Sequence, residues 1–269
     1  MIYFCPTPIG NMGDITYRSL EVLRNVDIIA CEDTRNSMKL LNHFNIKKKL
    51  ISYHKFNEKK MAQEIINLSN DNDIAIITDA GLPGISDPGY ILIKELVDKN
   101  LEFCVLPGGS AALTGLVLSG LNTEHFLFYG FVNSKSTKRK TELDGLKKFP
   151  YTLIFYEAPH RLVEFLEDLY EIFGNRRVSI SRELTKMFET TYRGMLEDIL
   201  KNFDITLKGE FVIVVDGFVK EDVNIDIKSE ILKEMANGFK KSKAVKNVAL
   251  KYNLSKNEVY KISLEVEDE

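Results

Sequence analysis

The sequence is poor in cysteine, in histidine and in long apolar runs, and each shortage excludes a class of protein. Its three cysteines, Cys5, Cys31 and Cys104, are odd in number, far apart and placed in apolar stretches, so we expect buried free thiols and a cytoplasmic location. The four histidines show no metal-ligand spacing with each other or with cysteine, so no structural zinc is predicted. No apolar run approaches the roughly 20 residues that span a bilayer, and the N-terminus lacks the basic start and cleavage site of a signal peptide.

Length and composition are those of a soluble globular protein. The 269 residues, of which 44% are hydrophobic and 28% charged, allow one large or two medium domains with a buried core. The formal net charge is only −3, but the charge is unevenly placed. Between Lys240 and Lys261 there are seven lysines and a single acid, Glu258, so this C-terminal segment is the basic part of the chain.

The first part of the chain alternates short β-branched runs with longer amphipathic ones. We expect strands at Ile2–Cys5, Asp27–Cys31, Leu50–Tyr53, Ile74–Thr78 and Phe103–Leu106. Helices are expected between them, at Tyr17–Asn25, Ser37–Phe44, Lys59–Asn70 and Tyr90–Lys99. This alternation predicts an α/β domain over residues 1–120, with an open, mostly parallel sheet covered on both faces. Ligands of such sheets bind beyond the carboxyl ends of the strands.

A second α/β domain is predicted over residues 121–220. Its strands and helices interleave less regularly, so we expect a mixed sheet. The expected strands are Phe126–Val132, Thr152–Glu157, Arg177–Arg182 and Glu210–Asp216, and the expected helices are about Ser136–Lys148, His160–Phe173 and Met195–Phe203. A polar stretch near Lys220–Ile227 is expected to lead into the last part of the chain.

Residues 221–269 are predicted to form a small, basic, helical tail. Apolar residues recur at helical spacing on two successive segments: Val245, Val248, Ala249 and Tyr252, then Val259, Ile262 and Val266. Ser255 and Glu258 have capping-box spacing at the start of the second segment. Two short helices joined by a tight turn resemble a helix-turn-helix. A docking tail whose lysines only keep it soluble is equally compatible with this pattern.

The most informative segment is the loop Thr78–Gly89, which follows the apolar run Asp73–Ile77. Three glycines, two prolines and two aspartates force an irregular conformation there. Main-chain groups that no strand pairing uses, together with two carboxylates, suit a small polar ligand. The lysine and hydroxyl of a G-x-x-x-x-G-K-[ST] phosphate loop are missing, which argues against a nucleoside triphosphate.

Two further loops follow predicted strands. The first is Thr7–Asn11, where Pro6 and Pro8 flank Thr7 and fix an extended turn that exposes backbone groups. A plain strand-to-helix connection would have the same sequence. Pro107–Ala111 opens a helix of small residues that runs to Gly120. Its paired glycines let a ligand approach the backbone, and Ser110 could cap the helix. The dinucleotide pattern G-x-G-x-x-G is incomplete, so that fingerprint is weak.

Two segments, Glu32–Ser37 and Glu157–Arg161, each place an arginine in the expected first turn of a helix. The helix dipole disfavours a cation there. Because this happens twice at strand ends, it points to an anionic ligand such as a phosphate backbone. Pairing of each arginine with Glu32, Asp33 or Glu157 would explain the same pattern. His160 could act as a base or as a hydrogen-bonding anchor.

Charged side chains are also dense directly after a later predicted strand, in Ser181–Thr190. The lysine, arginine and two glutamates of this segment could orient a hydroxyl group and screen a phosphate, although a solvated helix start would contain the same residues. Further on, Lys208-Gly209-Glu210 opens the last strand. Its glycine indicates close approach of a ligand or of another backbone segment.

These segments together resemble one family. The shared motifs, in order from Thr7 to Val212, are TPIGN, EDTR, the DAG…P…ISDPG loop, PG-x-SA, FYEAPHR, RELTK-x-FE and KGEFV. This order is seen in bacterial small-subunit ribosomal RNA 2′-O-methyltransferases, of the tetrapyrrole-methylase-like class (class III) of S-adenosylmethionine enzymes. The resemblance implies two α/β domains with S-adenosylmethionine in the cleft between them, a helical C-terminal extension and a homodimer. It also implies, as methyl acceptor, the 2′-hydroxyl of a decoding-site cytidine in 16S ribosomal RNA.

The resemblance and the loops above assign site residues by role, with no metal among them. The residues expected to bind S-adenosylmethionine are Pro8, Asp79, Ala80, Gly81, Gly84, Ile85, Ser86, Asp87, Gly108, Ser110, Ala111, Tyr156, Lys208, Gly209 and Glu210. The acceptor side, with the catalytic groups, is expected to comprise Glu157, His160, Arg161, Arg182, Glu183 and Lys186. Contacts with RNA are expected from Arg35, Lys240, Lys241, Lys243 and Lys246. Which acceptor-side group is the general base stays open.

Three other functions share parts of this pattern. A methyltransferase for a tetrapyrrole precursor would have the same fold and cofactor loops but no reason to carry a lysine-rich tail. A non-catalytic RNA-binding assembly factor would keep the tail and not bind S-adenosylmethionine. An NAD-linked dehydrogenase fits least, because the dinucleotide fingerprint is incomplete.

Overall fold

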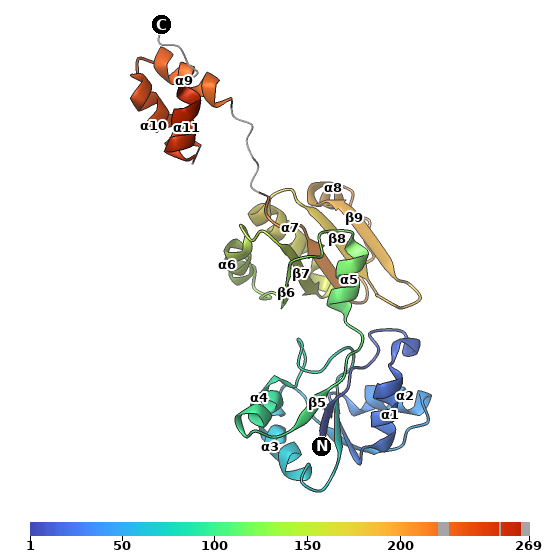
Figure 1. Cartoon of the computed structure of the whole chain (residues 1–269). Coiled ribbons are helices and arrows are strands. Elements are labelled where there is room, and N and C mark those ends of the chain that lie inside the picture. The colour runs from blue at the N-terminus through green and yellow to red at the C-terminus, as the bar shows by residue number, and fades with distance from the viewer. Residues whose placement is uncertain (220–225, 253, 265–269) are drawn as a thin grey trace. The chain divides into compact units, whose positions relative to one another are not determined.

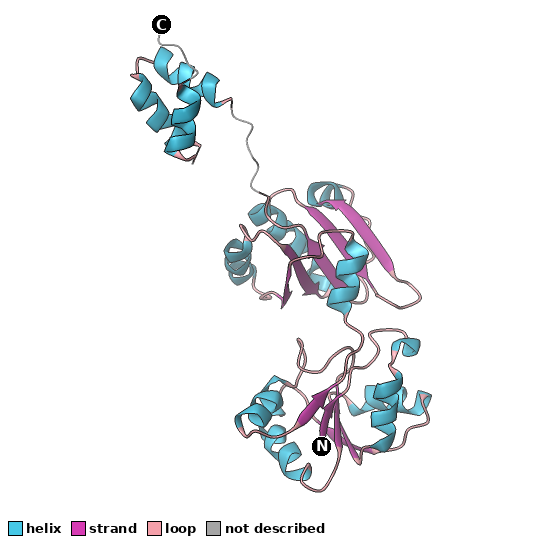
Figure 2. Ribbon diagram, viewed as in Figure 1, coloured by secondary structure: helices cyan, strands magenta, loops and turns pink. Residues whose placement is uncertain are grey.

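Five short strands in the N-terminal part of the chain pair in parallel (Figures 1 and 2). They are β1 (Ile2–Phe4), β2 (Ile28–Cys31), β3 (Lys49–Ser52), β4 (Ile74–Ile77) and β5 (Phe103–Val105). Their spatial order in this computed structural model is β3-β2-β4-β1-β5. The three strands that precede the irregular loops, β4, β1 and β5, are therefore neighbours. The parallel sheet expected from the sequence is confirmed.

Helices cover both faces of this sheet, as the alternating pattern predicted. They are α1 (Tyr17–Asn25), α2 (Thr34–His43), α3 (Glu58–Leu68) and α4 (Tyr90–Asp98), with a 3-10 turn at Met12–Asp14. Phe4 and Ile76 pack with α3 and α4, whereas Ile29 and Ile77 pack with α1 and α2. Successive side chains of a strand point to opposite faces, which is why β4 is apolar throughout.

The three cysteines are free thiols, but only two of them are buried. Burial raises the pKa of the Cys5 thiol to about 12, so it stays protonated. Cys104 is half-exposed and accepts a hydrogen bond from the Arg18 guanidinium at 3.4 Å. The expectation that all three are buried is wrong for Cys104, because β5 is the last strand of its sheet.

The next five strands form a second, mixed sheet, as predicted. They are β6 (Phe126–Phe131), β7 (Thr152–Glu157), β8 (Arg177–Arg182), β9 (Thr190–Met195) and β10 (Phe211–Val215), in the order β6-β7-β10-β8-β9. Only β6 and β7 are parallel; the other neighbours are antiparallel. Strand β9 was not expected from the sequence, because it is polar and lies at the edge of the sheet.

Different helices cover the two faces of the second sheet. Phe155 and Ile213 point to one face and Ile154 and Val214 to the other. The first pair packs with α6 (Ser136–Leu146), α7 (Leu162–Phe173) and α8 (Leu196–Lys201), and a 3-10 turn at Pro159–Arg161 precedes α7. The second pair packs with α5 (Ala111–Ser119). Because side chains alternate along β7, neighbouring residues at its carboxyl end face different helices.

The structure describes residues 1–219, 226–252 and 254–264, and these fall into two compact units, 1–218 and 219–269. Both sheets belong to the first unit, and its division into two domains near residue 120 stays a prediction. No helix in the described ranges combines the length and apolar character that crossing a membrane requires.

The second unit contains three helices in its described part, not the pair suggested by the sequence. They are α9 (Ile227–Ala236), α10 (Lys241–Lys251) and α11 (Lys256–Ser263). Ile231, Val245, Val248 and Val259 form a small apolar core, which confirms the predicted helix faces. Ser255 precedes α11 but makes no capping hydrogen bond through its side chain, so the predicted capping box is wrong. Val266 and most of the polar stretch near 220 lie outside the described residues.

Candidate functional site

The loops that follow β1, β4 and β5 meet at the carboxyl edge of the first sheet. The Thr7 N–H donates to the Gly81 carbonyl at 2.9 Å, and the Gly81 N–H donates to the Thr7 carbonyl at 3.1 Å. The Thr7 hydroxyl donates to the Thr78 carbonyl at 3.1 Å. A Cβ placed on Gly109 would lie 3.7 Å from Ile9. The three loops, Thr7–Asn11, Thr78–Gly89 and Pro107–Ala111, therefore adjoin one another, and we call them the ligand loops.

Glycine is required in the ligand loops for two different reasons. Gly81 and Gly84 have φ angles of +80° and +87°, which residues with a side chain rarely adopt. At Gly108 the reason is space, because a Cβ there would lie only 2.2 Å from Cγ of Pro6. These glycines let the backbone of the loops turn sharply and pack directly against neighbouring segments.

The second half of the loop Thr78–Gly89 closes on itself and touches the second sheet. The Gly84 N–H donates to the Pro88 carbonyl at 3.0 Å, and Ser86 has a positive φ of 64°. A Cβ on Gly130 of β6 would lie 3.2 Å from the Ser86 hydroxyl oxygen. The predicted ligand residues of this loop are therefore placed next to the second sheet as well as the first.

Acidic side chains gather near the ligand loops. Asp79 accepts a hydrogen bond from the Asn36 amide at 2.9 Å. Burial, followed by the charges of Glu32, Asp79 and Glu210, raises the pKa of Asp87 to about 7. Burial and the charge of Asp79 also raise the pKa of Glu32. This region is therefore electronegative, which favours a ligand that carries positive charge.

The start of α5 joins the ligand loops to the second sheet. Ser110 is the N-cap of α5, and its hydroxyl accepts from the Leu113 N–H at 3.4 Å. The Tyr156 hydroxyl accepts from the Ala112 N–H at 3.0 Å. Burial, with smaller contributions from Asp87 and Glu210, raises the pKa of Tyr156 to about 12, so its hydroxyl stays protonated and can also donate. The predicted cap at Ser110 is confirmed.

A second cluster consists of the charged turn Arg182–Glu189 and the segment Lys208–Glu210. Oε1 of Glu183 accepts from the Lys186 ammonium at 2.9 Å and from the Glu210 N–H at 3.1 Å. A second bond joins Lys186 to Oε2 of Glu210 at 3.0 Å. A Cβ on Gly209 would lie 2.2 Å from Oε1 of Glu183, which explains the glycine there.

This charged turn is strained and lies against the first ligand loop. Glu183 and Thr185 have positive φ angles of 53° and 65°, which are uncommon outside glycine. The Asn11 N–H donates to the Thr185 hydroxyl at 3.0 Å, and a Cβ on Gly10 would lie 2.5 Å from Cγ of Lys186. The charged turn is thereby brought next to Pro8 and the backbone of the ligand loops.

The electrostatics of this turn keep both Glu183 and Lys186 in their charged forms. Burial alone would raise the pKa of Glu183, but its bonds to Lys186 and Glu210 outweigh burial and lower it. Burial alone would lower the pKa of Lys186, and the bonds to Glu183 and Glu210 raise it instead. Lys186 therefore remains a cation beside the ligand loops at neutral pH.

Both unusual arginines pair with a neighbouring acid. The Arg35 guanidinium lies 2.7 Å from Asp33, although 82% of the Arg35 side chain remains exposed. The Arg161 guanidinium lies 2.5 Å from Glu157, whose side chain is fully buried. The local-pair interpretation is confirmed for both arginines. An anionic ligand stays a prediction, with Arg35 the more accessible of the two.

The acceptor-side residues expected from the sequence are only partly brought together. Tyr156 packs with the cluster beside α5, whereas Phe155 packs with the cluster beside α7. By alternation Glu157 faces α7 too, where it holds Arg161 and accepts from the Ala158 N–H at 2.8 Å. Within the described residues, Oε2 of Glu157 and Nε of Arg161 have no hydrogen-bond partner. His160 is exposed on the 3-10 turn before α7.

Arg182, Lys208 and the tail lysines complete the predicted set. Nε of Arg182 donates to the Lys208 carbonyl at 2.6 Å, so these two residues belong to the charged turn and its partner segment. Lys240, Lys243 and Lys246 are exposed in the second unit, and Lys241 is half-buried. Their role in binding RNA stays a prediction.

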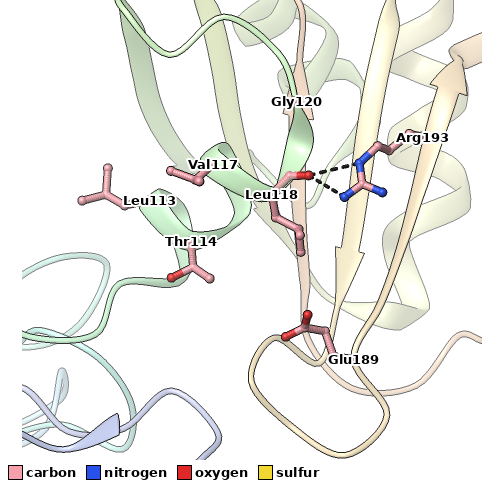
Figure 3. A pocket seen from close by; sticks show the side chains of 7 residues that line it. All are labelled: Leu113, Thr114, Val117, Leu118, Gly120, Glu189 and Arg193. Carbon is pink, nitrogen blue, oxygen red and sulfur yellow. Dashed lines mark hydrogen bonds between the residues drawn. The ribbon is translucent and has the colours of Figure 1, made fainter.

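An open pocket of about 820 Å³ lies between α5 and β9, next to Glu189 at the end of the charged turn (Figure 3). Its walls are formed by Leu113, Thr114, Val117, Leu118, Gly120, Glu189 and Arg193. The Arg193 guanidinium donates to the Leu118 carbonyl through two nitrogens, at 3.0 and 2.5 Å. Val117 is 74% exposed and Leu113 50%. None of the residues expected to bind S-adenosylmethionine lines this pocket.

Two polar residues that sequence reasoning did not select support the ligand loops. Thr7 links the loops after β1 and β4, as described above. Glu58, at the start of α3, accepts hydrogen bonds from Gly89 and Ile91. An acid in the first turn of a helix is ordinary, so the sequence gives no signal that Glu58 serves a different helix.

Matches to known proteins agree with this arrangement. The model of the family described as tetrapyrrole (corrin/porphyrin) methylases matches residues 1–200. The protein named "Ribosomal RNA small subunit methyltransferase I" of Bacillus subtilis (strain 168) is 41% identical, over 97% of this chain and 92% of its own length. Proteins with the same name are 42% identical in Halalkalibacterium halodurans, over 97% and 93%, and 40% identical in Synechocystis sp., over 99% and 98%.

Solved structures share the fold at low sequence identity. Uroporphyrin-III-C-methyltransferase from Thermus thermophilus is 19% identical with a TM-score of 0.58, over 80% of this chain and 93% of that one. A diphthine synthase is 14% identical with a TM-score of 0.63, over 80% and 89%. The chain therefore belongs to the tetrapyrrole methylase family and is an S-adenosylmethionine-dependent methyltransferase.

Proposed function

We propose that this enzyme methylates the ribose 2′-hydroxyl of a decoding-site cytidine in 16S ribosomal RNA. The observation that carries the proposal is the extent of the match to the relatives named for small-subunit ribosomal RNA, which reaches 97% of the chain. The family model ends at residue 200. The match to these relatives extends further and includes the last strand and most of the basic tail.

The ligand loops fit S-adenosylmethionine. It carries a sulfonium and an ammonium group but no phosphate, so it needs acidic and main-chain partners and no phosphate-loop lysine. Pro6 occupies the space that a Cβ on Gly108 would need, so the loop after β5 packs closely on the loop after β1, and we assign Gly108 to the adenosine part. Asp79 and Asp87 supply carboxylates for the hydroxyl and ammonium groups.

The other proposed contacts with the donor come from segments adjoining these loops. We assign this role to Pro8, Ala80, Gly81, Gly84, Ile85, Ser86, Ser110, Ala111, Tyr156, Lys208, Gly209 and Glu210. The contact of Ser86 with Gly130 and the bond from Ala112 to Tyr156 support this grouping, because they bring both sheets to the same ligand loops.

The charged turn is proposed to hold the methyl acceptor. S-adenosylmethionine supplies an electrophilic methyl group, and the protein must align the ribose oxygen with it, which can contribute on the order of 7–11 kcal/mol. Lys186, kept cationic by Glu183 and Glu210, is suited to stabilise negative charge that develops on the 2′-oxygen. Arg182 and His160 are assigned to the RNA backbone near it.

Glu157 and Arg161 are proposed to support this acceptor side from the α7 face. Their buried ion pair fixes the 3-10 turn that carries His160. Oε2 of Glu157 is a buried acceptor at the strand end without a hydrogen-bond partner within the described residues. This observation keeps Glu157 among the candidates for the general base.

Labelled methyl transfer to purified small ribosomal subunits, followed by mass mapping of the modified nucleotide, tests the function. Lys186→Ala is expected to lower kcat by about 10²–10³, with the Kd for S-adenosylmethionine changed by less than about twofold. Lys140→Ala is the matched control, because Lys140 of α6 pairs with Glu171 of α7, away from the ligand loops. A methyl group found on a nucleobase would contradict the ribose assignment.

Other results of the same assay would identify the rival functions. Methylation of a tetrapyrrole precursor and not of RNA would support the small-molecule enzyme. RNA binding without calorimetric binding of S-adenosylmethionine would support a non-catalytic assembly factor.

The basic tail and Arg35 are proposed to bind phosphates of the RNA. Replacing Lys240, Lys243 and Lys246 by glutamine is expected to weaken RNA binding and to reduce the salt-dependence slope by about 0.7–0.9 for each lost contact. Replacing three exposed lysines of the first unit, Lys59, Lys60 and Lys138, is the control. Equal slopes for both variants would show that the tail only keeps the protein soluble.

A homodimer is proposed to cover the open pocket beside α5. Exposed Leu113 and Val117 form an apolar surface of the kind that subunit contacts bury. Light scattering during gel filtration is expected to give a dimer mass for the natural protein and a monomer mass for Val117→Lys. A dimer that survives this substitution would place the interface elsewhere.

A further inference from the structure

A buried carboxylate from one helix fixes the base of the loop Gly84–Gly89. Glu58 is the first residue of α3 and is only 9% exposed. Its Oε1 accepts from the N–H groups of Gly89 at 2.8 Å and Ile91 at 3.1 Å, and from the Tyr53 hydroxyl at 3.1 Å. Gly89 is the N-cap of α4, so Glu58 caps a helix to which it does not belong.

Glu58 itself sits on a well-braced turn. The Asn57 side chain donates to the Ser52 carbonyl at 3.0 Å and accepts from the His54 N–H at 2.8 Å, which ties the start of α3 to the end of β3. Tyr53 is buried, and burial together with the Glu58 carboxylate raises its pKa, so its hydroxyl keeps the proton that it donates. The position of the carboxylate is thus determined by β3 and α3.

Holding Gly89 in place also holds Gly84. Gly89 has a φ of +146°, and a Cβ there would lie 2.8 Å from the Gly84 nitrogen. That nitrogen donates to the Pro88 carbonyl at 3.0 Å, so the two ends of the segment meet. Ser86 and Asp87 lie between these two ends, so their positions depend on the groups that hold Gly84 and Gly89.

We propose that Glu58 is a positioning residue for the methyl donor, acting through the main-chain N–H groups of Gly89 and Ile91. The inference rests on the donor site proposed above, since it assumes that Ser86 and Asp87 contact the donor. Glu58 makes no contact of its own with the donor in this account. Removing its side chain deprives three buried donors of their acceptor and releases the loop that carries the donor contacts.

Steady-state kinetics of five full-length variants tests the proposal. Glu58→Ala is expected to raise the KM for S-adenosylmethionine by at least about tenfold, while the KM for the ribosomal subunit changes by less than about twofold. Glu58→Gln is expected to restore the donor KM to within about threefold of the natural value, because its amide oxygen still accepts from both N–H groups.

Two further variants separate positioning from stability. Tyr53→Phe removes one bond to Glu58 but leaves both loop contacts, so its donor KM is expected to stay within about twofold. Leu96→Ala removes buried apolar atoms from α4, away from the loop, and lowers the melting temperature without changing the donor KM. Assays are run at a temperature at which melting curves show every variant folded.

The outcomes are distinguishable. A donor KM for Glu58→Ala no higher than that of Leu96→Ala overturns the proposal, and so does a Glu58→Gln variant as impaired as Glu58→Ala. Asp79→Ala is the reference for the donor site itself. If Asp79→Ala raises the donor KM and Glu58→Ala does not, the positioning role alone fails; if neither does, the proposed donor site fails with it.

Discussion

The carboxyl edge of the first sheet and the charged edge of the second are of opposite construction. At the first sheet, glycines with positive φ or no room for a Cβ let backbone segments pack directly against one another. At the second sheet, charged side chains hold one another in place, as in Glu157 with Arg161 and Lys186 with Glu183. The first edge should therefore be damaged by added atoms, and the second by removed charges. The predictions below test this contrast, from the largest expected effect to the smallest.

Adding one carbon to the first edge should have the largest effect. In Gly108→Ala the new Cβ would lie 2.2 Å from Cγ of Pro6, so the loop after β5 must move. Such overpacking costs about 1–3 kcal/mol, and a displacement near 1 Å can reduce activity about 100-fold. Gly145→Ala is the control, because nothing lies within 4 Å of its Cβ. Calorimetric binding of S-adenosylmethionine measures the difference; equal affinity in both variants would remove the distinction between the edges.

Among the effects on stability, that of removing one charge from the second edge should be the largest. Glu157→Ala leaves the Arg161 guanidinium, 20% exposed, without its partner. Breaking a buried pair from one side costs about 3–5 kcal/mol. Urea unfolding is the measurement, and the double variant with Arg161→Leu is expected to recover part of the loss, since no unpaired charge remains. A loss below about 1 kcal/mol would mean that the pair behaves as a surface contact.

A half-buried carboxylate at the first edge, Asp87, should give a pH dependence of the opposite sign to that of a paired acid. The pKa of Asp87 is about 7 in the folded chain against a reference of 3.8. Between these values the folded state holds a proton that the unfolded state has lost, so stability falls as the pH rises from about 4 to about 7. Asp87→Asn is expected to weaken this fall. Urea unfolding at several pH values checks it, and identical profiles would contradict the assignment.

The exposed counterpart of the buried pair should have the smallest effect on stability. Arg35→Ala removes the exposed partner of Asp33, a side chain that is 82% exposed, but keeps the main-chain N–H that Asp33 accepts from as the N-cap of α2. Exposed pairs contribute about 0–1 kcal/mol. The hydrogen bonds that Asp33 accepts from Arg35 lower the pKa of the Asp33 carboxyl to about 2, and the loss of the two side-chain bonds should hardly change the melting temperature. A drop as large as that of Glu157→Ala would contradict the argument from burial.

The sequence was sufficient to predict those elements for which one local signal dominated. Apolar runs predicted the strands of the first sheet, and glycine and proline predicted the loops between them, because both signals depend on local backbone preference. The same signals failed for β9, a polar edge strand whose pairing with β8 depends on distant residues. They also failed for Cys104, whose partial exposure depends on its place in the strand order.

The candidate site shows a similar limit for the same physical reason. The motifs located the residues near the ligand loops, but only the sheet register shows that Glu157 faces α7 while Tyr156 faces α5. The pairing of Arg161 with Glu157 could be anticipated as one of two alternatives. Glu58 could not, because its partners, Gly89 and Ile91, lie more than 30 positions further along the chain.

The place of β1 inside the first sheet has a consequence for biosynthesis. Ile2 is made before both of its partners, Ile74 on one side and Phe103 on the other. At about 5–20 residues per second, the ribosome needs about 5–20 seconds to make the strands that flank it. During that interval the apolar strand β1 is without both of its neighbours, so the first sheet forms only after residue 105 has been made.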